Sequence, residues 1–343
     1  MDHRPVAPHH PGGVRRLDRL GDDLVRALRP QALQARGPRP AGFGRTPVTI
    51  LVGYPLKLRS KAVTNLAAAL ARTRGEDLVV CVVAPAPWMP GMSRADQGYR
   101  AYIDELTEEA FGHARADLPD DVKATYTSVQ AKSAPVGLME AAEQHKASAI
   151  VVGSSDSGQF GYISLSSVAD RLLHSSPIPV AVATRGYRNT VGSVKRVTLA
   201  FTGGKHNTGL LVFARTLAAS YGCELRLASF AVHLSPPETA RFNTERGQVL
   251  DEWTENIYAA AERALDDNPG DTPRPEIVIG HGEDWDDAFE SIEWEPGDLL
   301  VLGSSEAGPI ERVFLGSRAT KIVRHSPVPV LVVPRRIVKA HAD

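Results

Sequence analysis

The stretch VVGSSDSGQFGYISLSSVADRLLHSSPIPVAV, residues 151–182, returns later in the chain as VLGSSEAGPIERVFLGSRATKIVRHSPVPVLV, residues 301–332. The two stretches lie 150 residues apart and align without a gap. A repeat of this spacing is too long for the unit of a solenoid protein and is about the length of one domain. The sequence therefore predicts two copies of one fold.

Identical residues occur at both ends of the repeat and in its middle. Gly153-Ser154-Ser155 matches Gly303-Ser304-Ser305, Ser167 matches Ser317, and a Ser-Pro-x-Pro step occurs at 176–179 and again at 326–329. Each copy begins in an apolar run, passes through a loop rich in Gly and Ser, and enters a helical pattern. This order indicates a strand, a loop and a helix.

The composition places the chain among ordinary soluble globular proteins. It has 343 residues, 43% hydrophobic residues and a formal net charge of -1, which favours neither nucleic acid nor a membrane as a partner. No apolar run approaches the ~18 residues of a transmembrane helix. The two cysteines, Cys81 and Cys223, lie in separate halves beside apolar runs, so we expect free buried thiols and a cytoplasmic location.

Residues 1–45 have no counterpart in the second half and contain nine Arg against four acidic residues. Leucines at helical spacing predict one short helix at 16–28, inside an otherwise mobile N-terminal tail. The alternative is a basic arm that contacts an acidic partner. Its histidines lack a Cys or carboxylate at ligand spacing, so we predict no metal site.

The rest of the chain alternates short apolar runs with amphipathic segments. In the first domain, residues 46–185, we expect strands at 48–53, 78–84, 123–130, 149–152 and 180–183, and helices at 60–72, 94–115, 136–145 and 166–173. In the second domain, residues 194–335, we expect strands at 196–201, 224–230, 276–279, 298–302 and 330–333, and helices at 208–220, 245–266, 286–292 and 317–324. Residues 336–343 are left as a C-terminal tail.

This alternation predicts an α/β fold, with two tandem doubly wound parallel sheets whose helices cover both faces. The linker at 186–193 is only a few residues long. Short linkers favour domains that pack side by side over domains that swing freely.

The repeat resembles the universal stress protein family, and the resemblance covers nearly all of residues 46–335. That family carries Gly-x-x-Gly, nine residues, then Gly-Ser or Gly-Thr after its fourth strand. The second copy gives Gly303-x-x-Glu306, nine residues, Gly316-Ser317, and the first gives Gly153-x-x-Asp156, nine residues, Ser166-Ser167. The resemblance implies a five-stranded, adenine nucleotide α-hydrolase-like fold and domains that pair, so that this chain would form an intramolecular pseudo-dimer, with a further homodimer as an added expectation.

The family signature has the chemistry of a phosphate site. Ligands of parallel sheets bind at the carboxyl ends of the strands, where this loop begins. Backbone N–H groups and a serine hydroxyl at a helix N-terminus bind anions, and glycine lets the backbone approach them. The cofactor-binding candidates are accordingly Gly303, Gly316 and Ser317 in the second copy, with Gly153, Ser166 and Ser167 as degenerate counterparts.

Both copies depart from the family pattern. Its middle glycine is replaced by Asp156 and Glu306, and a carboxylate 4 Å from a phosphate charge costs about 4 kcal/mol at an effective dielectric of 20. The family places an Asp directly after the first strand, where this chain has Pro55 and Thr202. We therefore expect the first nucleotide site to be lost and the second to be degenerate, with no certain cofactor. The alternative is weak binding of ATP in the second domain.

The loop Thr202-Gly203-Gly204-Lys205 is a second candidate for the same site. A glycine pair between a strand and a helix can cradle an anion, and Lys205 could pair with it. The loop also resembles in part the Ser-Gly-Gly-x-Asp-Ser loop of the ATP pyrophosphatases, although His206 and Asn207 replace the Asp and Ser. The simpler interpretation is a flexible turn into a helix.

The remaining polar clusters have structural explanations. The acids at 283–287 begin a short helix, where they complement its dipole. His174 and His325 lie near helix ends, and Trp253 and Trp285 are interpreted as packing residues. Without a catalytic set or dinucleotide fingerprint, the sequence predicts a non-catalytic stress-response binding or regulatory protein of the universal stress protein type. Its nucleotide sites are expected to be largely degenerate, and its protein partner is unknown. The alternatives are an ATP-binding switch, with slow hydrolysis in the second domain, and an ATP pyrophosphatase-like enzyme.

Overall fold

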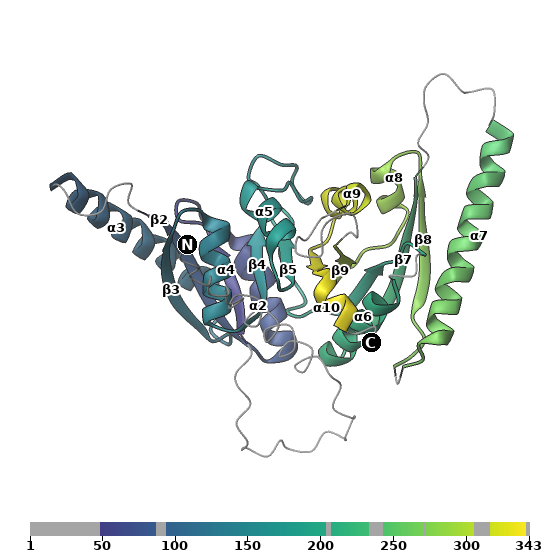
Figure 1. Ribbon diagram of the computed structural model, residues 1–343, viewed down its shortest axis with the longest axis horizontal. Coiled ribbons are helices and arrows are strands. Elements are labelled where there is room, and N and C mark those ends of the chain that lie inside the picture. Colours follow the sequence, from purple (N-terminus) through teal and green to yellow (C-terminus); the bar gives the residue numbers. More distant parts are fainter. Residues whose placement is uncertain are drawn as a thin grey trace, which may run out of the picture.

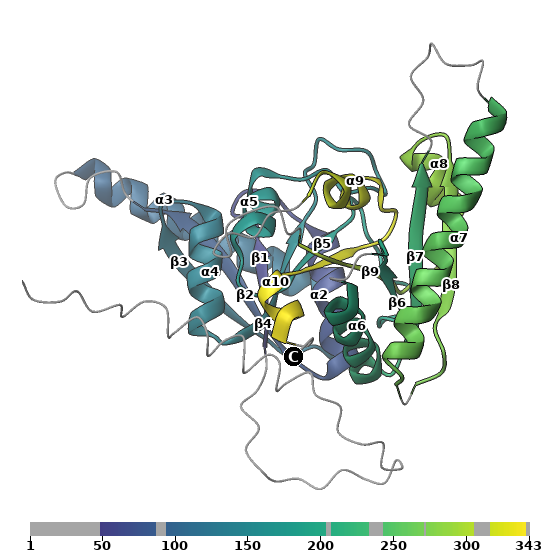
Figure 2. The same ribbon diagram turned by 45° about the vertical axis from the view of Figure 1, so that its right-hand side comes forward.

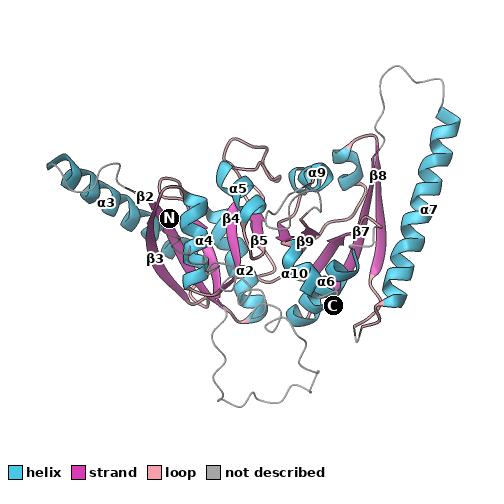
Figure 3. Cartoon of the chain, in the orientation of Figure 1, coloured by secondary structure: helices cyan, strands magenta, loops and turns pink. Residues whose placement is uncertain are grey.

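The computed structural model describes residues 49–86, 94–203, 207–232, 243–270, 272–304 and 316–340. Strands and helices alternate along them in the expected order (Figure 3). The first half contains β1 (Thr49–Tyr54), α2 (Lys61–Arg74), β2 (Asp77–Pro85), α3 (Arg94–Asp117), β3 (Ala124–Ala131), α4 (Ala134–Gln144), β4 (Ala147–Gly153), α5 (Ser167–Ser175) and β5 (Val180–Ala183). The helix expected at 16–28 lies outside the described residues.

The second half repeats the order and adds a helix at its end. It contains β6 (Arg196–Ala200), α6 (Asn207–Tyr221), β7 (Glu224–Val232), α7 (Asn243–Asp267), β8 (Glu276–Gly282), α8 (Trp285–Glu290), β9 (Asp298–Gly303), α9 (Ser317–His325), β10 (Val330–Val333) and α10 (Arg335–Ala340). The sequence analysis predicts a tail at residues 336–343, but in the structure α10 packs against α6 and buries Ile337. The reason is that Ile337 and Val338, the apolar pair of this basic helix, contact the hydrophobic core.

All ten strands belong to one sheet, in the order β3-β2-β1-β4-β5-β10-β9-β6-β7-β8. The neighbours within each half are parallel, and β5 pairs with β10 in the antiparallel sense through Ala181 opposite Leu331. Figures 1 and 2 show the two halves side by side with this pair at the centre. The edge that each half would otherwise expose is thereby covered by the other.

The helices form a layer on each face of the sheet. One buried cluster combines strand residues with α2, α3, α6, α7 and α10, and the second combines them with α4, α5, α8 and α9. Both clusters draw residues from the two halves. The hydrophobic core therefore continues across the β5–β10 pair, and the halves are packed together rather than strung on a linker.

The linker is itself held against the first half. The amide of Asn65 on α2 donates to the carbonyl of Tyr187 at 3.0 Å, and Val194 N–H donates to the Thr73 hydroxyl at 2.9 Å. Between these contacts, the Asn189 side chain accepts from the backbone N–H of Gly192 at 2.7 Å and closes a turn. These bonds fix the side-by-side arrangement.

The Ser-Pro-x-Pro steps are built identically in the two copies. The fully buried Ser176 hydroxyl donates to the carbonyl of Ile178 at 2.7 Å, and Ser326 donates to Val328 at the same distance. Each serine satisfies a buried carbonyl directly before the last strand of its half, where an unpaired group would cost about 1–3 kcal/mol.

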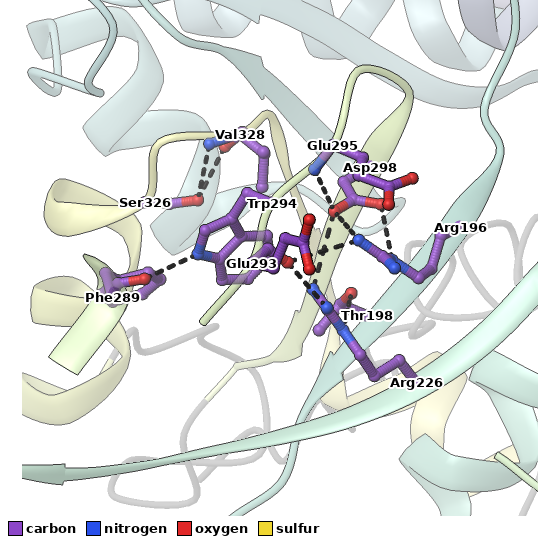
Figure 4. A network of polar contacts seen from close by, with 10 residues as sticks. All are labelled: Arg196, Thr198, Arg226, Phe289, Glu293, Trp294, Glu295, Asp298, Ser326 and Val328. Carbon is purple, nitrogen blue, oxygen red and sulfur yellow. Dashed lines mark hydrogen bonds and ion pairs between the residues drawn. The ribbon is translucent and has the colours of Figure 1, made fainter. Parts of the chain in front are cut away.

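A buried charge network supports the amino ends of the strands in the second half (Figure 4). Asp298, at the start of β9, accepts from Arg196 Nε at 2.8 Å and Nη2 at 2.7 Å. The buried Arg226 guanidinium lies 3.6 Å from the same carboxylate and also donates to the Glu293 carbonyl at 2.9 Å. Trp294 covers Arg226 at 5.0 Å, so the network is shielded from water at the edge opposite the predicted site.

None of the helices within the described ranges combines the length and apolar composition that crossing a bilayer requires.

Candidate functional site

A pocket of about 270 Å³ lies at the carboxyl ends of β1 and β4 in the first half. The loop after β1, the signature loop after β4 and the helices α2, α4 and α5 surround it. Its lining consists of Gly53, Tyr54, Pro55, Leu56, Leu58, Ser60, Val63, Val83, Ala134, Leu138, Val152, Gly153, Ser154, Ser155, Asp156, Ser166 and Val168. The pocket thus lies where ligands of parallel sheets bind.

Glycines near the strand ends allow the side chains that line this pocket to pack closely against the strands. A Cβ at Gly53 would lie 2.8 Å from Leu138, and one at Gly153 would lie 2.8 Å from Val63. Tyr54, between them and the loop, accepts a hydrogen bond from Ser60 N–H at 3.3 Å, and burial raises the pKa of its hydroxyl. Tyr54 therefore contributes no charge to the pocket at neutral pH.

The signature loop of the first half is closed by its own hydrogen bonds. Ser155 N–H donates to the Ser164 carbonyl at 2.7 Å, and Ser164 N–H donates to the Ser154 hydroxyl at 2.7 Å. Gly158 N–H donates to the Ser155 carbonyl, and Ser154 N–H to Ala183. These amides already have acceptors, so the loop does not present them to a phosphate.

The helix that follows this loop is capped in the first half and open in the second. The Ser166 hydroxyl accepts from Ala169 N–H at 3.1 Å at the start of α5. At the start of α9, Gly316 occupies the same position and makes no side-chain cap. Only the second copy therefore leaves the amide at this position without a side-chain cap, while Ser167 and Ser317 begin the two helices.

The structure places the other predicted residues of the second half as follows. Thr202 and Gly203 follow β6, which pairs with β9, and Gly303 ends β9. Gly203 has a φ of 78° and packs against α7, where a Cβ would lie 2.8 Å from Ile257. Gly204, Lys205 and Glu306 lie outside the described residues. Of the anion loop predicted at 202–205, the structure therefore describes only Thr202 and Gly203.

Aromatic side chains occupy the second-half positions that line the pocket in the first. Val83 and Phe230 are both the seventh residue of equivalent strands, and Leu138 and Phe289 both lie five residues after the N-cap of equivalent helices. The rings of Phe230 and Phe289 stack with centroids 4.1 Å apart, and Trp285, the counterpart of Ala134, lies 6.3 Å from Phe230.

Arg318 lies beside this aromatic cluster. It is the second residue of α9, the position that Val168 holds in α5. Its Nη2 donates to the Phe230 carbonyl at 3.1 Å, and its guanidinium lies 5.6 Å from the ring of Trp253. Among the described residues of the second half, larger side chains therefore occupy the positions that line the first-half pocket. Burial lowers the pKa of Arg318.

The signals for this difference were present in the sequence as size differences: Val83 against Phe230, Ala134 against Trp285, Leu138 against Phe289. They carry meaning only once the strands and helices are superposed in register. The sequence interpretation of Trp253 and Trp285 as packing residues agrees with their contacts.

The acidic and histidine clusters keep structural roles. Asp284 caps α8 by accepting from Asp287 N–H at 3.0 Å. His174 Nδ1 lies 2.7 Å from the Asp170 carbonyl within α5, and His325 Nδ1 lies 2.6 Å from Asp286. Throughout the described ranges, no three His, Cys, Asp or Glu side chains gather as a metal site would require.

The family model for universal stress proteins matches this chain twice, at residues 48–184 and 193–334. The chain belongs to the universal stress protein family. A universal stress protein of Mycobacterium tuberculosis is 31% identical over 295 residues, which cover 84% of this chain and 100% of that protein. Both halves of this chain are therefore copies of the family domain, as the repeat predicts.

Solved structures agree on the fold. A universal stress protein from Archaeoglobus fulgidus has a TM-score of 0.53 and 23% identity, and the match covers 84% of this chain and 98% of that one. Another universal stress protein, solved in complex with cAMP, is 22% identical and matches 40% of this chain with a TM-score of 0.28. The nucleotide is a property of that protein.

Proposed function

We propose that this universal stress protein is a non-catalytic ligand-binding and regulatory protein whose small-molecule pocket lies in its first domain. The observation that carries the proposal is the contrast between the halves. The first has a pocket of about 270 Å³ at the carboxyl ends of its strands, and the second holds Phe230, Trp285 and Phe289 at the equivalent positions. Concave sites of this kind, apolar with a few polar groups, are typical of small-molecule binding.

The chemistry of the lining supports binding rather than catalysis. Its polar side chains are Tyr54, the serine hydroxyls and Asp156, and the seventeen lining residues include no His, Lys, Arg or Cys. A serine nucleophile needs a neighbouring base to activate it. The buried Tyr54 hydroxyl, whose pKa is raised, does not supply one at neutral pH.

A regulatory output is supported by the path of the signature loop. Arg185 holds this loop through a bond from its N–H to the Tyr162 carbonyl at 2.9 Å. Burial raises the pKa of Tyr162, and the carboxylates of Glu290 and Asp286 in the second half raise it further. The loop that contains Tyr162 and lines the pocket therefore lies within electrostatic range of α8 in the second half.

A second candidate, an ATP-binding switch in the second domain, is favoured by a different observation. Gly316 leaves the start of α9 without a side-chain cap, and no acidic residue stands in the first turn of that helix. Those features suit a phosphate group. In this version ATP would bind through its phosphates, with Gly303, Ser317 and the loop from Thr202 around it.

Ligand-observed NMR with a fragment library on the full chain tests the first candidate. Val83→Phe, which copies Phe230 into the first half, should remove the hits, and Ala134→Trp, which copies Trp285, should do the same. Circular dichroism confirms that both variants fold. Fragments that bind both variants as well as the wild type would refute the pocket assignment.

Calorimetry with Mg-ATP separates the second candidate from the first. An Asp at position 316 is a good N-cap, so Gly316→Asp should fold while placing a negative charge where a phosphate would bind. ATP binding that Gly316→Asp abolishes and Val83→Phe preserves would establish the switch. No heat with millimolar ATP would exclude it.

A further inference from the structure

We infer that the first-domain pocket takes an uncharged, phosphate-free small molecule with an apolar ring and hydroxyl groups, the chemistry of a nucleoside, and that it discriminates against nucleotides. The inference rests on the proposed function, because it names the ligand class of the same pocket. The inference gives the two halves different ligand preferences. Of α5 and α9, only α9 in the second half begins without a side-chain cap, as a phosphate-binding helix end does.

The walls of the pocket call for an apolar body. Its lining includes nine aliphatic side chains, counting Pro and Ala: Pro55, Leu56, Leu58, Val63, Val83, Ala134, Leu138, Val152 and Val168. The volume of about 270 Å³ approaches the lower end of the range for ligand pockets, roughly 300–1,000 Å³. A single ring system with a small polar appendage fits these dimensions better than a triphosphate chain does.

The polar rim is uncharged except for one acid. The hydroxyls of Ser60, Ser155 and Ser166 line the pocket and can exchange hydrogen bonds with ligand hydroxyls. Asp156 lines it as well, with an exposed carboxylate that repels anions. Hydroxyl-bearing and neutral groups are therefore favoured at the rim over negatively charged ones.

The backbone donors that would bind a phosphate are already used. Ser155, Gly158 and Ser164 donate their N–H groups inside the loop, and Ser157 N–H is directed at the Ser155 hydroxyl at 3.4 Å. Ala169 N–H at the start of α5 donates to Ser166. A phosphate at this position would have to displace several of these bonds before it gained any of its own.

The helix end and the nearby cations add no compensating charge. Asp170 stands in the first turn of α5, where a negative charge opposes an incoming anion. Arg59, close to the pocket in sequence, makes a bidentate pair with Asp117, Nε to Oδ2 at 2.9 Å. Lys57 is exposed and does not line the pocket. No basic side chain on the lining therefore offsets the acids.

The test is a titration of the full-length Gly316→Asp chain, which disables the second-domain helix end, with adenosine, 5′-AMP and ATP. Adenosine and 5′-AMP share the base and ribose and differ only in the phosphate. We expect adenosine to bind at least about tenfold more tightly than 5′-AMP, since one unit-charge pair at 4 Å costs ~1 kcal/mol even in water and the phosphate carries nearly two charges. Adenosine binding should be lost in Val83→Phe and in Ala134→Trp.

Copying the second-half residue and removing the acid should then weaken the discrimination. Ser166→Gly reproduces Gly316 and is a mild change of the helix N-cap. Combined with Asp156→Asn, it should raise the affinity for 5′-AMP by about tenfold. The affinity for adenosine should fall rather than rise, because the double variant removes the Ser166 hydroxyl from the rim and leaves the apolar walls unchanged. The preference for adenosine over 5′-AMP should therefore shrink.

Three results would overturn the inference. The first is 5′-AMP or ATP binding as tightly as adenosine and being lost in Val83→Phe; a further loss in Lys57→Gln would show that Lys57 supplies the phosphate site. The second is adenosine binding that survives both pocket-filling variants. The third is no adenosine binding at millimolar concentration while other fragments bind the pocket, which would leave the proposed function standing and the ligand class wrong. If no fragment binds either, both fail.

Discussion

Replacing Asp298 with Asn tests whether the buried charge network holds the second domain together. The Asp298 side chain is 1% exposed and accepts two hydrogen bonds from Arg196, while Arg226, 3% exposed, lies 3.6 Å away. Asn has nearly the same shape but no charge, so the change leaves two largely buried guanidinium groups without their counter-ion. Burial and the neighbouring Arg196 already lower the pKa of Arg226.

Breaking a buried ion pair by removing one partner costs about 3–5 kcal/mol, most of it from the charge left uncompensated. For a domain of this size, such a loss corresponds to a fall in melting temperature of roughly 10 °C. The network lies at the amino ends of the strands, opposite the pocket. Asp298→Asn should therefore lower stability without changing ligand affinity in the first domain at a temperature where the protein is folded.

Urea unfolding followed by tryptophan fluorescence measures this change. Three of the four tryptophans, at 253, 285 and 294, lie in the second half, so the signal mainly reports that domain. The matched control is Asp121→Asn, which removes an exposed carboxylate paired with Arg72 at 2.5 Å and should shift the midpoint little. If Asp298→Asn shifts the midpoint no more than this control, the network is not a stabilising counter-ion site and the reasoning fails.

Other features give further expected outcomes. Phe230→Val should destabilise the second domain by about 2–4 kcal/mol, because it removes a ring from the stacked cluster and leaves a cavity; a urea midpoint within error of the wild type would contradict the filled-pocket description. Burial raises the pKa of Glu76, so the folded state holds a proton that the unfolded state releases above its ordinary pKa of about 4.3. The stability contributed by this group is therefore present at low pH and lost as pH rises through the raised pKa. Relative to the wild type, Glu76→Gln should gain stability between pH 4.5 and 7, and the opposite slope in paired urea titrations would refute this. Burial raises the pKa of the Cys81 and Cys223 thiols to about 12, so in native protein at pH 8 an aromatic disulfide reagent should label them only slowly; stoichiometric labelling on mixing would show that they are accessible.

Residue types and their spacing predict only part of the candidate site. The repeated loop, its spacing and the acid at its centre predict a ligand site at the end of the fourth strand in each half. They also led to the expectation that the second copy, with Gly316 and Ser317, is the better ATP site. That expectation concerns phosphate binding, and the uncapped start of α9 supports it as a proposal. The described pocket lies in the other half, at the carboxyl ends of β1 and β4, with side chains of β2, α4 and α5 in its walls.

The sequence by itself determined the order and type of the elements, the duplication and the family. These depend on short-range patterns: apolar runs long enough for buried strands, helical spacing between them, and a loop motif repeated at a fixed interval. The described strands and helices agree with the expected ones to within a few residues at their ends, because such patterns act locally.

Only the tertiary structure decided where the described pocket of the first half forms and how the halves join. The pocket in the first half depends on Val83, Leu138 and Val168, which meet only when a parallel sheet brings distant segments together. Likewise β5 and β10 are both short and fully buried. A run of four apolar residues does not specify its partner strand, so their antiparallel pairing could not be predicted from the sequence. Side-chain volume and sheet edges take effect through packing between remote segments, and the linear order of residues does not encode that packing locally.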